Sequence, residues 1–272
     1  MKIVYFSKLL PQRYPETFNK LIPILEKYNI QHKLLEATKD IWCRDFMPVQ
    51  TKSGKLIQFR YEPSYLKGYE HLRSDPEEVC EANNIQPTFF SDINLDGGNV
   101  LICKDRAIIS DRVFDENPDK DKKELITEIE KLLEAEVIII PSQKSDFTGH
   151  ADGMVRFVDR NIILGNDREK EFKNWSKEIN KVVDQYGLKY EDVPFFCDFK
   201  DKKHPRHAIG IYVNYLEVND LIVIPIFELS GNKDIEAKER FKQIFPSRKI
   251  ETINYKEIGL EGGLLNCSTW TI

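Results

Sequence analysis

A unit of secondary structure recurs along this chain of 272 residues, and it constrains the fold more than any other feature. Each unit is predicted to contain a β-hairpin, an amphipathic helix and a further strand. One chemically notable residue stands near the start of each hairpin, and the five are Asp45, Asp96, His150, Asn214 and Cys267. Their spacings are 51, 54, 64 and 53 positions. Recurrence at such a period indicates internal pseudo-symmetry.

The clearest unit lies between residues 100 and 140. Apolar runs on either side of Lys104-Asp105-Arg106 predict a hairpin. The stretch from Asn117 to about Ala135 has apolar residues at helical spacing and predicts an amphipathic helix. Its apolar face consists of Leu125, Ile129, Leu132 and Leu133. The apolar run 137–140 then predicts a buried strand.

The remaining units contain the same kinds of element. Strands are predicted at 2–6, 56–60, 155–158, 161–164, 211–216, 221–226 and 249–253. Helices are predicted at 15–28, 168–186 and 234–245, with a further helix start at Asp75-Pro76. These assignments follow from hydrophobic spacing and from the capping residues that begin a helix.

The last unit begins at Gly259, and no residues are left for its helix. The N-terminal strand and helix can complete this unit, and their pairing with it would close the units into a ring. The five notable residues would then point into one central channel. No Gly/Ser-rich stretch interrupts the chain, so we expect a single α/β domain over residues 1–272.

Charge and cysteine content argue against several classes of protein. The 40 Lys and Arg residues against 45 Asp and Glu give a net charge of −5, which disfavours nucleic-acid binding. The 5 cysteines form no Cys-x-x-Cys pair, so neither a zinc site nor a disulfide framework is expected, and a reducing cytoplasm fits best. The N-terminal apolar run is too short for a signal peptide, and no run reaches the length of a membrane span.

Cys267 is the strongest candidate for chemistry. It follows Gly262-Gly263 and a short apolar stretch, and glycines allow the backbone to approach a ligand closely. A nucleophilic cysteine needs a nearby cation or dipole that stabilises its thiolate, and a protonated histidine or a cationic substrate could supply it. The alternative is that Cys267 is a small buried hydrophobic residue, as most free cysteines are.

His150 is the candidate acid/base, and Asp152 lies two positions after it. On an extended segment both side chains would project to the same side, which suits a proton-transfer group beside a carboxylate anchor. The alternative is a loop histidine with a turn-forming aspartate. A second histidine cluster, His204-Pro205-Arg206-His207, has the proline and the charges of a surface loop and is discounted.

Asp45 lies between Trp42 and Met47, so we expect its charge to be partly desolvated and to need a partner. Arg44 could be that partner. A substrate guanidinium is the functional alternative. Two aspartates that face this planar cation fix its position and its plane through charge-assisted bidentate hydrogen bonds.

Asp96 and Asn214 complete the candidate residues. The sequence Asp96-Gly97-Gly98-Asn99 predicts a turn into a strand, and the Asp96 carboxylate could hold the His150 ring in its working tautomer. Asn214 is predicted within the strand 211–216, where asparagine is unfavourable. A place in the site would account for it.

These motifs follow one another in a fixed order along residues 42–267. They are Trp42-x-Arg44-Asp45 with Pro48, Asp96-Gly97-Gly98-Asn99, Gly149-His150-x-Asp152 with Arg156-Phe157, Tyr212-Val213-Asn214-Tyr215 with Pro225, and Glu261-Gly262-Gly263 ahead of Asn266-Cys267. The ordered set resembles the agmatine deiminase and bacterial peptidyl-arginine deiminase family. This family belongs to the guanidino-modifying, or pentein, superfamily.

The resemblance implies a five-bladed, pseudo-symmetric α/β propeller around a central channel, in agreement with the repeat. It implies that Cys267 is the nucleophile and His150 the acid/base, with Asp96 near the histidine. Asp45 and Asp152 would clamp the guanidinium. The full set of expected substrate-binding residues is Asp45, Asp152, Asn214 and Trp42. No cofactor and no metal are expected.

Three functions are open on the sequence. The first is a deiminase, in which Cys267 adds to the guanidinium carbon, ammonia leaves, and water releases a ureido product from a covalent thiouronium intermediate. The second is an amidinotransferase, in which an amine replaces the water. The third is a pentein that binds a partner without catalysis. The expected ligand is a small cationic guanidino compound: agmatine, arginine, a peptidyl arginine or a methylated guanidine. The oligomeric state is open.

Overall fold

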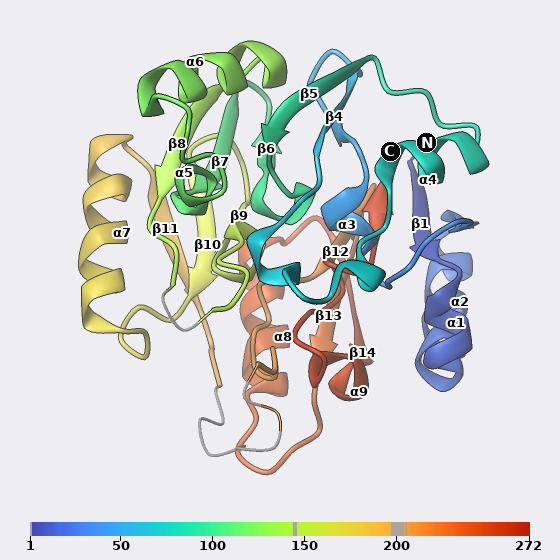
Figure 1. Cartoon of the computed structure of the whole chain (residues 1–272). Helices are drawn as coiled ribbons and strands as arrows, with labels where there is room; N and C mark the ends of the chain where they lie inside the picture. The colour runs from blue at the N-terminus through green and yellow to red at the C-terminus, as the bar shows by residue number, and fades with distance from the viewer. Residues whose placement is uncertain (1, 144–145, 197–203, 205) are drawn as a thin grey trace.

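The fold consists of five three-stranded sheets arranged around a common centre, as the computed structural model in Figure 1 shows. The structure describes residues 2–143, 146–196, 204 and 206–272. Sheet by sheet, the strands are β3 (Val49–Gln50), β4 (Leu56–Arg60) and β5 (Phe89–Asn94); β6 (Leu101–Cys103), β7 (Arg106–Ser110) and β8 (Glu136–Ile140); β9 (Val155–Phe157), β10 (Ile162–Asn166) and β11 (Lys189–Val193); β12 (Leu216–Val218), β13 (Leu221–Ile226) and β14 (Lys249–Asn254); and β15 (Trp270–Thr271), β1 (Ile3–Ser7) and β2 (Gln31–Leu35).

Every sheet repeats one connection. The middle strand pairs antiparallel with the first strand and parallel with the third, so a crossover helix joins the middle and third strands. The crossover helices are α4 (Pro76–Ala82), α6 (Lys122–Leu133), α7 (Lys173–Gln185), α8 (Asp234–Ile244) and, in the last unit, α1 (Leu9–Arg13) with α2 (Pro15–Lys27). This order of hairpin, helix and strand confirms the predicted repeat.

The two ends of the chain close the ring. β15 pairs antiparallel with β1, with Val4 opposite Thr271, and β1 pairs parallel with β2. The N-terminal strand and helices therefore complete the unit that begins near Gly259, as predicted. The two termini lie side by side in Figure 1, where the Ile3 amide donates a hydrogen bond to the Ile272 carbonyl. The single-domain organisation stays a prediction.

Helix α6 begins at Lys122 rather than at Asn117. The buried Asn117 side chain is used in a turn instead: it accepts a hydrogen bond from the Asn94 amide and donates to the carbonyl oxygens of Asn94 and Val113. Asp121 caps the helix, because its carboxylate accepts hydrogen bonds from the backbone of the first turn.

Residues 211–215 form turns rather than the predicted strand, so the placement of Asn214 in mid-strand is wrong. The reason is the packing of two fully buried tyrosines. The Tyr212 hydroxyl donates to Asp234, and the Tyr215 ring packs edge-on against α8. Both side chains are directed into the core, which prevents the alternation of a strand.

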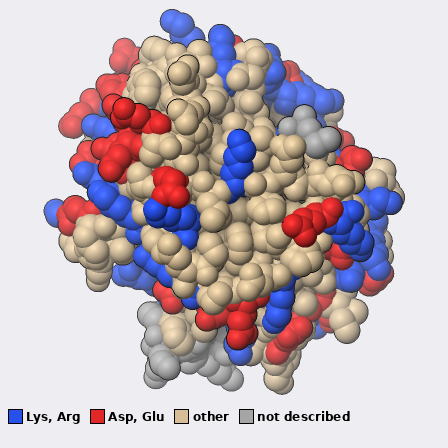
Figure 2. All heavy atoms as spheres, turned by 90° about the vertical axis from the view of Figure 1, so that its right-hand side faces the viewer, with Lys and Arg blue, Asp and Glu red and all other residues tan. Residues whose placement is uncertain are grey.

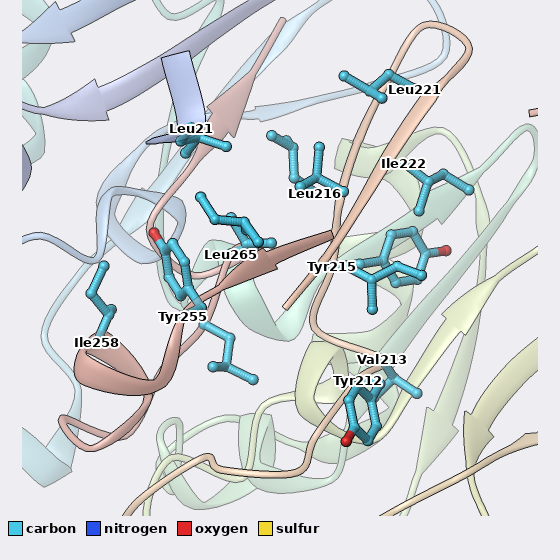
Figure 3. Packing of buried hydrophobic residues seen from close by; sticks show 14 of the residues in the cluster. Leu21, Tyr212, Val213, Tyr215, Leu216, Leu221, Ile222, Tyr255, Ile258 and Leu265 are labelled. Atoms are coloured by element: carbon cyan, nitrogen blue, oxygen red, sulfur yellow. The ribbon is translucent and has the colours of Figure 1, made fainter. Parts of the chain in front are cut away.

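Apolar side chains fill the space between the sheets and their helices. The largest cluster joins β12, β13 and β14 to α8 and extends to β1 and α2. Figure 3 labels several members of this cluster: Leu21, Tyr212, Val213, Tyr215, Leu216, Leu221, Ile222, Tyr255, Ile258 and Leu265. Smaller clusters fill the neighbouring units. This apolar packing fixes the sheets, and so fixes the polar turns that precede them.

The face of the molecule seen in Figure 2 carries Lys and Arg interspersed with Asp and Glu around a largely uncharged centre. A nucleic-acid site needs Lys and Arg clustered on one face. The described part of this face has mixed charges instead. None of the described helices is long and apolar enough to cross a membrane.

Candidate active site

Five polar turns meet at the centre of the ring, one ahead of the first strand of each sheet. They contain α3 (Cys43–Phe46), the 3-10 helices η3 (Gly97–Asn99) and η4 (Ala151–Gly153), and the turns at 212–214 and 265–268. All five notable residues of the sequence repeat lie in these turns or beside them. The repeat therefore places equivalent chain segments around one axis.

Each turn is hydrogen-bonded to the next. Around the ring, the donor and acceptor pairs are Gly98 N and Asp45 Oδ1 (3.2 Å), Ala151 N and Asn99 Oδ1 (3.1 Å), Asn214 Nδ2 and Asp152 O (3.4 Å), Asn266 N and Asn214 Oδ1 (3.0 Å), and Arg44 N and Cys267 O (3.1 Å). These bonds form a closed circuit. The circuit holds the candidate residues at fixed positions relative to one another.

A cavity of about 320 Å³ opens at this centre, within the size range of small-molecule sites. Trp42, Asp45, His150 and Cys267 line it. Aromatic side chains form much of the remaining wall: Tyr14, Tyr61, Tyr65, Tyr69 and Phe147. The other predicted residues contact members of this lining: Asp96, Asp152 and Asn214. The structure thus brings all seven predicted residues into one cluster.

Cys267 is in contact with two other turns. Its Sγ accepts a hydrogen bond from Asn214 Nδ2 at 3.1 Å and lies 3.6 Å from Asp152 Oδ2. Burial, and after it the charges of Asp152 and Asp45, raises the pKa of the Cys267 thiol well above its ordinary value. The sulfur is therefore a thiol at neutral pH unless a cation comes close to it.

His150 lies between two carboxylates. Its Nε2 is 2.8 Å from Asp96 Oδ2, and its Nδ1 is 3.5 Å from Asp45 Oδ1. Burial by itself lowers the pKa of the imidazole, but the two carboxylates outweigh burial and raise that pKa to about 10. His150 is therefore an imidazolium at neutral pH and can donate a proton.

Asp45 is buried in the same cluster of charges. Burial raises the pKa of its carboxyl to about 8; the charge of His150 opposes this rise, and the charges of Asp96 and Asp152 add to it. A cation beside Asp45 would restore the carboxylate. The electrostatics of the site thus favour a positively charged ligand.

Gly98 marks the point where these groups converge. A Cβ atom on this residue would lie 2.4 Å from Asp45 Oδ1, 2.8 Å from His150 Nδ1 and 3.5 Å from Asp152 Oδ2. Two carboxylates and the imidazole therefore approach one point beside the backbone. No residue larger than glycine fits there.

Asp152 faces the nucleophile from a 3-10 turn. It lies in η4, which begins directly after His150. The expectation that His150 and Asp152 share an extended segment is therefore wrong. Asp152 is 1% exposed, and its Oδ2 accepts a hydrogen bond from Asn266 Nδ2 at 2.6 Å. Asn266 and Cys267 are thereby both tied to this carboxylate.

Arg44 does not form the ion pair with Asp45 that the sequence left open. Among the described residues, no ion pair joins the two; Arg44 Nε instead lies 3.4 Å from the carbonyl oxygen of Asn266, to which it donates. Trp42, two positions earlier, packs over Gly263, where a Cβ would lie 2.5 Å from the indole. The close approach allowed by Gly263 places the Trp42 ring in the cavity wall.

The second histidine cluster lies closer to the site than expected. Arg206 lines the cavity, and its guanidinium lies 4.6 Å from the centre of the Phe147 ring. Arg206 is exposed, as expected of a surface loop. The segment nevertheless contributes this one side chain to the cavity wall, while His204 and His207 do not line the cavity. Pro205 is outside the described residues.

Tyr65 belongs to the site, although no sequence pattern indicates it. Its hydroxyl donates to Asp96 Oδ2 at 2.7 Å, and its ring meets the His150 ring edge-on, with 5.9 Å between centres. It lies in the 3-10 helix η1 (Ser64–Leu66), in a connecting segment without hydrophobic periodicity. Among the residues that the structure describes, no group of three or more His, Cys, Asp or Glu side chains is arranged to hold a metal ion.

A ring of five α/β units with a polar central site is the fold of the pentein superfamily, and solved agmatine deiminase structures share this fold with the chain. Residues 15–272 match the family described as Porphyromonas-type peptidyl-arginine deiminase. The chain belongs to this family.

Individual relatives agree with this assignment. The agmatine deiminase of C. jejuni has a TM-score of 0.78 at 16% identity, over 99% of this chain and 92% of that one. The agmatine deiminase of Enterococcus faecalis has a TM-score of 0.73 at 16% identity, over 98% and 92%. A relative from Listeria monocytogenes, provisionally named agmatine deiminase 2, is 24% identical over 293 residues, which cover 86% of this chain and 74% of that protein.

Proposed function

We propose that this chain is a deiminase, a hydrolase that converts a guanidinium substrate to a ureido product and ammonia. The observation that carries the proposal is the approach of Cys267, His150 and Asp45 to one cavity of about 320 Å³. Membership of the family supports the same chemistry, as do the relatives named for agmatine deiminase.

Substrate binding is proposed to activate the nucleophile. The guanidinium lies between Asp45 and Asp152, where charge-assisted hydrogen bonds orient its plane. Its positive charge offsets the two carboxylates that keep Cys267 protonated, so the bound substrate favours the thiolate. The thiol gives its proton to solvent, and the reactive sulfur forms only when the substrate is present.

In the first half-reaction, the Cys267 thiolate adds to the guanidinium carbon and a C–S bond forms. His150 Nε2 is engaged with Asp96, so Nδ1 is the nitrogen that faces Asp45 and the substrate. Nδ1 donates its proton to the departing nitrogen, the C–N bond breaks, and ammonia leaves. A covalent thiouronium remains on Cys267.

In the second half-reaction, His150 acts as a base. Its neutral Nδ1 accepts a proton from water, and the resulting hydroxide adds to the thiouronium carbon. The C–S bond then breaks and the added hydroxyl loses its proton to solvent, which regenerates the thiolate and releases the ureido product. The released proton converts ammonia to the ammonium ion. The overall change consumes one guanidinium and one water and yields one ureido compound and one ammonium ion.

We propose a small alkylguanidine, with agmatine as the first compound to test. The aromatic wall suits an alkyl chain. Charged side chains of both signs also line the cavity: Arg13, Asp40, Arg206 and Glu261. Compounds with a terminal ammonium and compounds with an amino-acid head group therefore both belong in the test. The proposed compartment is the cytoplasm, where a reducing environment preserves a nucleophilic thiol.

Release of ammonia by the purified protein tests the proposal. The panel contains agmatine, arginine, a blocked peptidyl arginine and methylguanidine, and mass spectrometry identifies the ureido product. Cys267→Ser should release no ammonia, while Cys80→Ser, a change in a buried thiol outside the cavity, should stay active. A folded protein that releases ammonia from none of these compounds refutes the proposal. Transfer of the amidino group to an added amine would instead identify an amidinotransferase.

A further inference from the structure

The segment between β4 and α4 forms the cavity wall beside His150. It carries η1, and within η1 the Tyr65 hydroxyl reaches the Asp96–His150 pair. The acceptor is Asp96 Oδ2, the same oxygen that lies 2.8 Å from His150 Nε2. One carboxylate oxygen therefore accepts hydrogen bonds from both Tyr65 and His150.

Residues of the next unit fix the position of η1. Glu116 accepts hydrogen bonds from the backbone amide of Ser64 at 2.9 Å and from its hydroxyl at 2.7 Å, and Arg112 donates to the same hydroxyl at 2.7 Å. The Tyr65 ring packs edge-on against Phe147, with 4.9 Å between centres. Tyr65 is thus held both through its backbone neighbour and through its ring.

The Tyr65 hydroxyl remains a donor under ordinary conditions. Burial, and after it the charge of Asp96, raises the pKa of Tyr65 well above its ordinary value. The hydroxyl keeps its proton, so it can donate a hydrogen bond to Asp96 Oδ2. A hydrogen bond to an ionised acceptor is stronger than one between neutral groups.

We propose that Tyr65 is a positioning residue that sets how firmly Asp96 holds the imidazolium of His150. The proposal rests on the deiminase function proposed above. The Tyr65 hydroxyl fixes the orientation of the Asp96 carboxylate and takes up part of the negative charge on Oδ2. The imidazolium is then held less tightly, and Nδ1 gives its proton more readily to the leaving nitrogen.

The variant Tyr65→Phe keeps the ring and removes the hydroxyl. In the free protein, ¹⁵N NMR should find that His150 titrates at higher pH than in wild type, with the resonance assigned by its loss in His150→Asn. The kcat on the best substrate should fall roughly tenfold, which corresponds to about 1.4 kcal/mol, with KM changed less than about twofold. Ser64→Ala, which removes two of the three hydrogen bonds that hold η1, should shift the titration in the same direction by less.

Tyr190→Phe is the matched control, because the buried Tyr190 hydroxyl donates to the Asn166 carbonyl, outside the site. It should leave both the His150 titration and kcat unchanged. An unchanged His150 titration in a folded Tyr65→Phe protein overturns the proposal, even if kcat falls, since a purely structural role would produce that result. The titration needs no turnover. The wild-type protein could therefore be inactive while the His150 titration still shifts in Tyr65→Phe. That result would reject the deiminase function and retain the coupling between Tyr65 and His150.

Discussion

Binding of a guanidinium should expel a proton from Asp45. Burial raises the pKa of this carboxyl to about 8, so most of the molecules hold the proton at pH 7 and fewer hold it at pH 8. The bound cation favours the carboxylate, while His150, with a pKa of about 10, keeps its own proton at pH 7. We therefore expect at least about half a proton released per substrate bound at pH 7, and less at pH 8.

Isothermal titration calorimetry of Cys267→Ser with agmatine measures this release. The variant prevents turnover and removes the thiol proton from the balance. The slope of the observed heat against the ionisation enthalpy of the buffer gives the number of protons. Asp45→Asn in the same background keeps the shape of the side chain and should release almost none. Equal release from both proteins, or none from either, would refute this account of Asp45.

Three further predictions concern the same cluster. Gly98→Ala should lower kcat/KM by about 100-fold or more, because its Cβ displaces Asp45 and His150; Gly153→Ala, whose nearest contact would be 3.7 Å away, should stay near wild type in the same kinetic assay. The free energy of unfolding should fall between pH 5 and pH 7, because folded Asp45, with its raised pKa, holds a proton that the unfolded chain has lost. For one proton, the free energy of unfolding changes by about 1.4 kcal/mol per pH unit. Urea unfolding at several pH values should find a smaller change in Asp45→Asn. An equal change in both proteins would contradict the raised pKa of Asp45. Asp152→Asn should cost roughly 2–5 kcal/mol of transition-state stabilisation, as the loss of one partner of a buried charge pair does; steady-state kinetics near wild type would remove Asp152 from the site.

The ring could be predicted because its elements follow hydrophobic spacing in unit after unit. α6 and the β6–β7 hairpin bury regular apolar faces, and such spacing is visible in the sequence. β2 was missed because most of its residues are exposed, so it shows no alternation. α7 begins at Lys173 rather than at residue 168, where the Arg168 guanidinium forms an ion pair with Asp192.

Five of the seven candidate residues could be predicted because each is a chemically unusual residue at an equivalent place in the repeat. Tyr65 could not be predicted in this way. It lies outside the repeated turns, and its partner Asp96 comes from the next unit, so only the packing of neighbouring units brings them together. The strict requirement for glycine at position 98 has the same origin, because Asp45 and His150 approach it from two other turns.

Covalent labelling tests the central claim that Cys267 is the nucleophile of a site for cationic guanidino compounds. A haloacetamidine is a small cation with a reactive carbon, and it should alkylate Cys267 faster than it alkylates free cysteine. Peptide mass spectrometry should find the label on Cys267, with labelling slowed by agmatine and by Asp45→Asn, and no label on the buried Cys43. Label on another cysteine, with Cys267 unmodified in a folded sample, would contradict the account.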